Sequence, residues 1–121
     1  MGQTEVKRKA IPKKTRLKVY DKFNGHCAYC GCEIGYKDMQ VDHKESLYWY
    51  AGADEIENYM PSCRACNFYK STMTLERFRE QLQKIPVRLE KDFIYRLAKK
   101  YGMVMEQEVP IQFYYEMLES K

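Results

Sequence analysis

Long apolar runs are missing from the sequence, and only two histidines occur among its 121 residues. No window approaches the roughly 18 consecutive apolar residues that a membrane-spanning helix needs. The polar N-terminus lacks the apolar segment of a signal peptide, so we expect a cytoplasmic protein without membrane contact. There is no internal repeat and no low-complexity segment, which excludes repeat architectures. The length fits one ordinary domain with its own core.

The net charge of +4 is too small to require a nucleic-acid partner, but the charges are unevenly distributed. Residues 1–22 contain eight basic and two acidic side chains, whereas residues 31–62 contain two basic and seven acidic ones. A basic segment beside an acidic one favours a protein that meets a polyanion at one surface and holds a cation at another. A solvated N-terminal tail would explain the basic segment equally well.

Five cysteines in a cytoplasmic chain are more often metal ligands or free thiols than disulfides. Four of them form two Cys-x-x-Cys pairs, Cys27 with Cys30 and Cys63 with Cys66. Two such turns supply four thiolates to a tetrahedral Zn²⁺, which makes a closed structural site without an open position for chemistry. Two unrelated thiol pairs, or a redox motif, are the weaker alternatives. Cys32 is expected to be a free thiol.

The interval between the two cysteine pairs holds 32 residues, from Cys30 to Cys63, whereas a plain zinc ribbon has about 15–20. A substructure of its own should therefore fold inside this interval. It includes a predicted short strand at residues 39–43, which ends on the dipeptide Asp42-His43. A histidine in such a strand is often structural, so its role depends on what else the sequence brings to it.

The hydrolysis of a phosphodiester needs a base for water, a hard cation held by oxygen ligands, and a partner that fixes the tautomer of the base. The sequence offers His43 as the base, Asp42 and Asn67 as metal ligands, and Asn58 as the orienting partner. Neighbouring residues of a regular strand point to opposite faces. Asp42 and His43 can serve one phosphate only if the strand ends or bends at His43.

Several basic residues are candidates for contacts with DNA phosphates. Lys70 and Ser71 follow Asn67 at helical spacing and would share its face. The N-terminal segment would add phosphate affinity that weakens with salt, through Lys13, Lys14 and Arg16.

Apolar residues at helical spacing predict four helices, at residues 15–24, 63–70, 74–85 and 87–101. Thr15 and Thr74 are the expected N-caps, Gly25 and Gly102 are expected stops, and Pro86 should break the third helix. Residues 48–58 favour a loop. The last segment is ambiguous, with a strand near residue 104 and a short helix after residue 110 as its best interpretation.

The segments "CAYCG", "MQVDH" and "ENYMPSCRACNFYKS" closely resemble the HNH endonucleases, over about residues 15–80. The resemblance implies an α+β fold, with a small zinc-stapled ββα-metal (HNH) core, an N-terminal helix and additional C-terminal helices. We divide the chain into a flexible basic arm at 1–12, the core at 13–85 and a helical C-terminal extension packed on the core at 86–121.

The same resemblance implies that His43 activates water, that Asp42 and Asn67 bind a catalytic divalent ion such as Mg²⁺ or Mn²⁺, and that Asn58 braces the loop and the base. The expected activity is metal-dependent hydrolysis of DNA phosphodiesters, by nicking or cleavage, with low sequence specificity. It would invert phosphorus and leave a 3′-hydroxyl and a 5′-phosphate. The sequence departs from the family at residues 44–46 and 51–53, which face the substrate. The size would suit a phage or mobile-element nuclease.

A non-catalytic protein is the alternative function. It would use the zinc-stapled scaffold to bind nucleic acid or to inhibit another protein. Its contact surface would be the C-terminal third, which could also form a homodimer able to cut both strands of a duplex.

Overall fold

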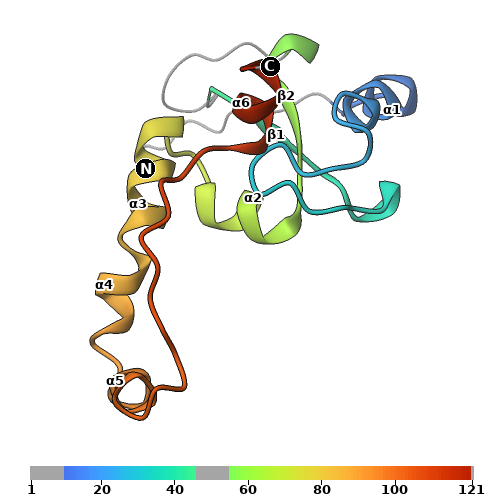
Figure 1. Cartoon of the computed structure of the whole chain (residues 1–121). Helices are drawn as coiled ribbons and strands as arrows, with labels where there is room; N and C mark the ends of the chain where they lie inside the picture. Colours follow the sequence, from blue (N-terminus) through green and yellow to red (C-terminus); the bar gives the residue numbers. More distant parts are fainter. Residues whose placement is uncertain (1–9, 46–54, 121) are drawn as a thin grey trace, which may run out of the picture.

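The computed structural model describes residues 10–45 and 55–120, and Figure 1 shows their arrangement. The elements, in order, are α1 (Lys13–Asp21), the 3-10 turn η1 (Tyr36–Asp38), β1 (Gln40–His43), η2 (Ile56–Asn58), β2 (Tyr59–Ser62), α2 (Arg64–Lys70), α3 (Leu75–Gln83), α4 (Ile85–Leu89), α5 (Phe93–Lys100) and α6 (Tyr114–Glu119). The predicted α+β class is confirmed. Two predicted features lie outside the described residues. They are most of the basic arm at 1–12 and the aromatic part of the loop, at residues 48–50. Among the described helices, none combines the length and the apolar composition needed to cross a membrane.

The sheet of the described chain has two antiparallel strands, paired Gln40↔Ser62, Val41↔Pro61, Asp42↔Met60 and His43↔Tyr59. Both strands are edges, so Pro61 is tolerated although it has no N–H group to donate. Its carbonyl oxygen accepts a hydrogen bond from the backbone N–H of Ala28 at 2.8 Å. This bond attaches the first cysteine turn to the open edge of β2.

Helix α1 begins three residues earlier than predicted, because Pro12 rather than Thr15 occupies the N-cap position. The extended backbone of Pro12 leads directly into the helix, and its carbonyl oxygen accepts from the N–H of Arg16 at 2.9 Å. The helix ends at Asp21, three residues before the predicted end at residue 24, and the turn that follows it reaches Gly25, which has a φ of 77°. A Cβ there would lie 2.8 Å from the hydroxyl oxygen of Tyr20, so only glycine fits.

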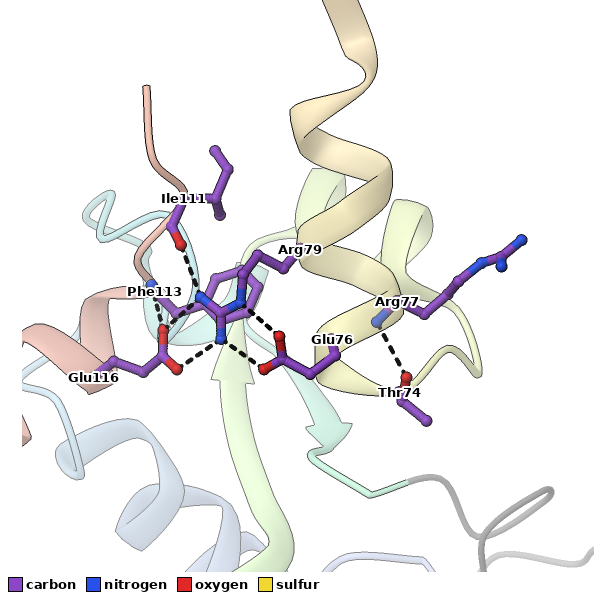
Figure 2. Close-up of polar contacts among 7 residues, drawn as sticks. All are labelled: Thr74, Glu76, Arg77, Arg79, Ile111, Phe113 and Glu116. Atoms are coloured by element: carbon purple, nitrogen blue, oxygen red, sulfur yellow. Dashed lines mark hydrogen bonds and ion pairs between the residues drawn. The ribbon is translucent and has the colours of Figure 1, made fainter. Parts of the chain in front are cut away.

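The helices after the second cysteine pair follow the prediction only in part. The hydroxyl oxygen of Thr74 accepts from the N–H of Arg77 at 3.1 Å and caps α3, as predicted (Figure 2). Pro86 does not break a helix; it lies in the first turn of α4, where its missing N–H costs little. The single helix predicted at 87–101 is wrong: the carboxylate of Asp92 accepts from the N–H of Tyr95 at 3.2 Å and starts α5 anew. Within the described residues, no strand forms near residue 104, whereas α6 confirms the short helix after residue 110.

The core forms where the tail of the chain returns to the first cysteine turn. The ring of Phe113 stacks on Phe78 at 5.2 Å and meets Tyr29 edge-on at 5.3 Å. The backbone N–H groups of Tyr114 and Tyr115 donate to the carbonyl oxygens of residues 29 and 28, at 3.0 and 2.9 Å. The tail therefore continues the hydrogen bonding of the zinc turn and covers it.

Arg79 on α3 fastens this tail in place (Figure 2). Its guanidinium donates to both carboxylate oxygens of Glu116, at 2.9 and 2.7 Å, and to the carbonyl oxygen of Ile111 at 2.7 Å. It also pairs with Glu76 of its own helix at 3.1 Å and lies over the ring of Phe113 at 4.7 Å. The carboxylate of Glu116 in turn accepts from the N–H of Phe113 at 2.9 Å. One side chain thus holds the start of α6 through polar and ring contacts together.

The helices α4 and α5 extend away from this core, and the segment after α5 runs back beside them (Figure 1). Both helices lie wholly within the described residues, and neither buries a side chain. The C-terminal extension is therefore not a single helical layer over the core. Its end packs on the core, and its first part projects.

Candidate functional site

The four cysteines of the two Cys-x-x-Cys pairs come together as predicted. Their sulfur atoms lie within 4.8 Å of one another, and those of Cys30 and Cys63 are 3.8 Å apart. A tetrahedral zinc with Zn–S bonds of about 2.3 Å separates its sulfurs by about 3.8 Å. The donor set and its spacing therefore fit a structural Zn²⁺. Cys32 lies outside this group of four sulfurs.

The backbone around the sulfurs favours thiolates. The N–H groups of Tyr29 and Cys66 point at the sulfurs of Cys27 and Cys63, each at 3.4 Å. A hydrogen bond from the side chain of Cys66, with help from backbone N–H groups, lowers the pKa of Cys27 to about 4 against the opposing effect of burial. The pKa of Cys66 is raised, first by this shared hydrogen bond and then by burial. Burial raises the pKa of Cys30 as well, so the binding of a cation would have to displace protons from Cys30 and Cys66.

The second cysteine pair also starts the helix that carries Asn67. Cys63 is the N-cap of α2, and its carbonyl oxygen accepts from the N–H of Asn67 at 3.0 Å. Since β2 ends at Ser62, the zinc site fixes the junction between β2 and α2. The partly exposed side chain of Asn67 lies one turn into that helix.

Asp42 is buried, and two side chains bind the same oxygen of its carboxylate. The hydroxyl of Tyr29 donates to Oδ2 at 2.6 Å, and the ammonium nitrogen of Lys70 lies 3.0 Å from Oδ2. Burial, followed by the nearby charge of Asp42, raises the pKa of Tyr29, so its hydroxyl remains a donor. An ionised carboxylate can stay in this interior because both contacts compensate its charge.

Lys70 is fully buried and binds both residues of the Asp42-His43 dipeptide. Its Nζ pairs with the carboxylate of Asp42 and donates to the carbonyl oxygen of His43 at 3.0 Å. This burial contradicts the predicted contact between Lys70 and a DNA phosphate. Lys70 lies three residues after Asn67 on α2, and its side chain points at β1 rather than at solvent. A lone lysine at helical spacing gives no sign of this, because lysine is exposed by default.

His43 is the last residue of β1, so the strand ends where the prediction requires it to end. The imidazole is buried and meets the ring of Tyr59 edge-on at 5.3 Å. The next residues are held by Asn58, whose side-chain amide accepts from the N–H of Glu45 at 2.8 Å and donates to the carbonyl oxygen of the same residue at 2.9 Å. The backbone carbonyl of Asn58 also accepts from the N–H of Lys44 at 2.8 Å. Asn58 therefore fixes the path of the chain immediately after the histidine.

The basic residues of α1 divide into two groups. Lys13 and Lys14 are exposed in its first turn. Arg16 is half-buried; its Nη2 donates to the carbonyl oxygens of Tyr36 and Met39 at 3.0 and 2.7 Å, and its guanidinium lies over the ring of Tyr36. The predicted role of Arg16 in DNA binding therefore competes with a structural role in anchoring α1.

Two further residues support the site without having been identified from the sequence. Tyr29 occupies a variable position of its Cys-x-x-Cys turn, and nothing in that motif specifies a contact with Asp42. Lys22 donates from Nζ to the carbonyl oxygens of Ile56 and Tyr59, at 3.0 and 2.6 Å, and thereby ties α1 to β2. Burial lowers the pKa of Lys22.

Comparisons with known proteins agree with this arrangement. Residues 27–72 match the model of the HNH endonuclease family. The SPbeta prophage-derived protein YoqL of Bacillus subtilis (strain 168), which is named as an HNH endonuclease, is 33% identical over 69 residues; the match covers 50% of this chain and 30% of YoqL. The crystal structure of the Type II-C Cas9 enzyme from Actinomyces naeslundii superposes with a TM-score of 0.51 at 18% identity, over 78% of this chain and 11% of that one. The last likeness is one of fold, and the chain spans less than a third of either relative.

Proposed function

Residues 27–72 form a domain of the HNH endonuclease family, and on this basis we propose that the chain is a metal-dependent endonuclease that hydrolyses DNA phosphodiester bonds. The observation that carries the proposal is the end of β1. There Asp42 and His43 are held together by one buried ammonium group, beside the zinc-fixed helix that bears Asn67.

The oxygen donors of the site fit a hard divalent ion such as Mg²⁺ or Mn²⁺. Tyr29 and Lys70 both bind Oδ2 of Asp42, so we assign Oδ1 of this carboxylate, with the amide oxygen of Asn67, to that ion. When bound, the ion would supply positive charge to the scissile phosphate and its leaving oxygen. Lys70 pairs with this carboxylate and restrains its orientation.

His43 acts as the general base in this proposal. Its ring accepts a proton from water, whose oxygen forms a new bond to phosphorus as the bond from phosphorus to the 3′-oxygen breaks. Attack in line with the leaving oxygen inverts phosphorus, and the 3′-oxygen takes a proton from a second water molecule, so that the products are a 3′-hydroxyl and a 5′-phosphate. Asn58 contributes by fixing the backbone at Glu45, so that the loop after the base keeps one path.

The structural zinc takes no part in the reaction, because four thiolates fill its coordination sphere. Exposed Lys13 and Lys14 on α1 are the candidates for phosphate contacts outside the catalytic centre. Neither residue reads bases, which is in keeping with low sequence specificity. A single active site suits nicking of one strand.

A non-catalytic binding protein is the second candidate, and the exposed apolar side chains of α4 and α5 are the observation that favours it. Such a protein would have no chemical need for the Asp42-His43 dipeptide or for Asn67. The two candidates therefore differ in what happens when His43 is replaced.

The test uses supercoiled plasmid with Mg²⁺ or Mn²⁺, the wild-type chain, His43→Ala and a reaction with EDTA. We expect nicking by the wild-type chain, none with EDTA, and a loss of at least about a hundredfold in His43→Ala, because general-base catalysis contributes that much. His26→Ala is the matched control, since His26 is the other histidine of the chain and lies outside the site. Equal activity of wild type and His43→Ala, or none in any metal, would refute the proposal.

A further inference from the structure

The exposed apolar surface of the chain is concentrated in one region. Of the fifteen large apolar side chains that are exposed among the described residues, eleven belong to residues 85–109, which we name the arm. The arm comprises α4, α5 and the segment that runs back from α5 (Figure 1). Soluble monomers rarely display an apolar patch of this extent, and such patches usually mark an interaction site.

Helix α5 carries an apolar face that the described residues of the chain leave largely exposed. Phe93, Ile94 and Tyr101 are 64%, 67% and 73% exposed, and Leu97, one turn after Phe93, is 37% exposed. The spacing of these residues predicts a buried face, yet α5, described in full, buries no side chain. A face of this kind stabilises a helix only when a partner covers it.

A groove of about 910 Å³ lies at the base of the same arm. One wall comes from the end of α3 and from α4, with Leu82, Ile85 and Val87, and the other comes from the returning segment, with Val109 and Ile111. The lining is mainly apolar, and the volume accommodates several large side chains. An amphipathic helix that lays its apolar face into such a groove is a common mode of protein recognition.

The charges of helix and groove are of opposite sign. Helix α5 contains three basic residues and no acidic one, whereas the returning segment at 103–111 contains two acidic residues and no basic one. Glu106 already binds Lys99 of the same chain at 3.0 Å, but Glu108 on the groove wall and Lys100 at the end of α5 are both exposed. Because each copy has both a basic apolar helix and an acidic apolar groove, a second copy is the occupant that complements both at once.

We propose that two copies of this chain form a symmetric dimer, in which α5 of each copy lies in the groove at the base of the other copy's arm. The interface is isologous, since the same two surfaces meet twice. Each half contributes the apolar face around Phe93 and Leu97, with Lys100 directed toward Glu108 of the second copy. The proposal rests on the exposure and charge of the arm and does not depend on the nuclease chemistry.

The test is sedimentation equilibrium of the full chain with its zinc, over about 1 to 100 μM, a range in which complexes of ordinary affinity assemble. We expect the mass to rise with concentration toward twice the monomer mass of 14.5 kDa. Phe93→Glu should weaken the dimer at least about tenfold, because the symmetry places the charge in the interface twice. Leu17→Glu is the matched control: Leu17 is exposed on α1, outside the arm, and its replacement should leave the dimer intact.

A charge exchange adds specificity to the test. Glu108→Lys should weaken the dimer, and the double variant Glu108→Lys/Lys100→Glu should restore much of it. Hydrogen exchange gives a second readout that needs no substitution: residues 85–109 should become protected as the concentration rises.

A wild-type chain that remains monomeric at the highest concentration would overturn the dimer, as would a dimer that survives Phe93→Glu. Protection of the arm that appears only on addition of duplex DNA would overturn it too and would assign the arm to nucleic acid. A chain that nicks DNA but stays monomeric would contradict only the proposed dimer. A chain that forms the dimer but does not cut DNA would contradict only the proposed nuclease function.

Discussion

Substitution of methionine for Lys70 would leave the buried carboxylate of Asp42 without its ionic partner. In the wild-type chain the ammonium group is fully buried, lies 3.0 Å from Oδ2 of Asp42 and also donates to the carbonyl oxygen of His43. After substitution, that oxygen would keep the hydrogen bond from the hydroxyl of Tyr29, at 2.6 Å. The end of β1 would therefore carry an uncompensated charge in the interior.

The expected cost is large. Removal of one partner from a buried ion pair destabilises a protein by about 3 to 5 kcal/mol, because the other charge stays desolvated. The lost bond to the carbonyl of His43 adds about 1 kcal/mol. Domains of this size unfold with roughly 5 to 15 kcal/mol in total, so Lys70→Met should remove about a quarter or more of the stability.

The assay is urea unfolding followed by circular dichroism, at low temperature and with zinc present, in a double-mutant cycle of Lys70→Met and Asp42→Asn. Because the double variant contains neither buried charge, its loss should be smaller than the sum of the single losses by at least about 2 kcal/mol. Lys84→Met is the control: Lys84 and its partner Glu80 are both more than half exposed, so the change should cost less than about 1 kcal/mol. The reasoning fails if Lys70→Met is as mild as this control, or if the two single losses simply add.

Four further predictions concern the supports of the site and of the tail. Removal of zinc by a chelator should unfold the core and abolish nicking even with Mg²⁺ present. Metal analysis should find about one zinc per folded chain. A folded chain without zinc would refute the structural role of the metal. Asn58→Ala should lower kcat about tenfold with KM nearly unchanged, because the loop after His43 loses both hydrogen bonds to Glu45 while the substrate contacts remain. An unchanged rate in single-turnover assays would contradict this prediction. Arg79→Met should release the tail, seen as faster hydrogen exchange at residues 111–120, whereas Arg77→Ala on the exposed side of α3 should not. The hydrogen bond from Arg79 lowers the pKa of Glu116 below its usual 4.5. The contact therefore stabilises the fold above pH 4.5, and this stabilisation is lost as the pH falls through the pKa that Glu116 has in the folded chain. Hydrogen-exchange protection of the tail that persists at the lowest pH would contradict this dependence on Glu116.

The parts of the structure that the sequence predicts well are those with local causes. The Cys-x-x-Cys turns specify their own geometry, Thr74 caps the helix that starts immediately after it, and Gly25 takes the only backbone conformation that its neighbours allow. The end of β1 at His43 follows from the same kind of information, since the composition changes there. Each of these predictions depends on a few consecutive residues.

The features of the structure that the sequence does not predict depend on residues far away in the chain or on a covering surface that is missing from it. Lys70 is buried because Asp42, 28 residues earlier, needs a counter-charge, and a lysine on a helix gives no local sign of that need. The helix predicted at 87–101 is divided because the capping bond of Asp92 competes with its continuation. The apolar spacing of α5 correctly predicts an amphipathic helix, but spacing alone does not say whether the covering surface belongs to the same chain.

Tyr29 explains why distant parts of this small fold should act together. Its backbone belongs to the first zinc turn, its hydroxyl binds the carboxylate of Asp42, its ring packs against Phe78 and Phe113, and its carbonyl accepts from the first residue of α6. The turn that carries two of the four clustered cysteines therefore also positions the carboxylate of Asp42. The tail is hydrogen-bonded to that residue as well, although it lies outside residues 27–72, which match the family model. The zinc, the dipeptide at the end of β1 and the tail are one cooperative unit, whereas the arm, which shares none of these contacts, remains available for a partner.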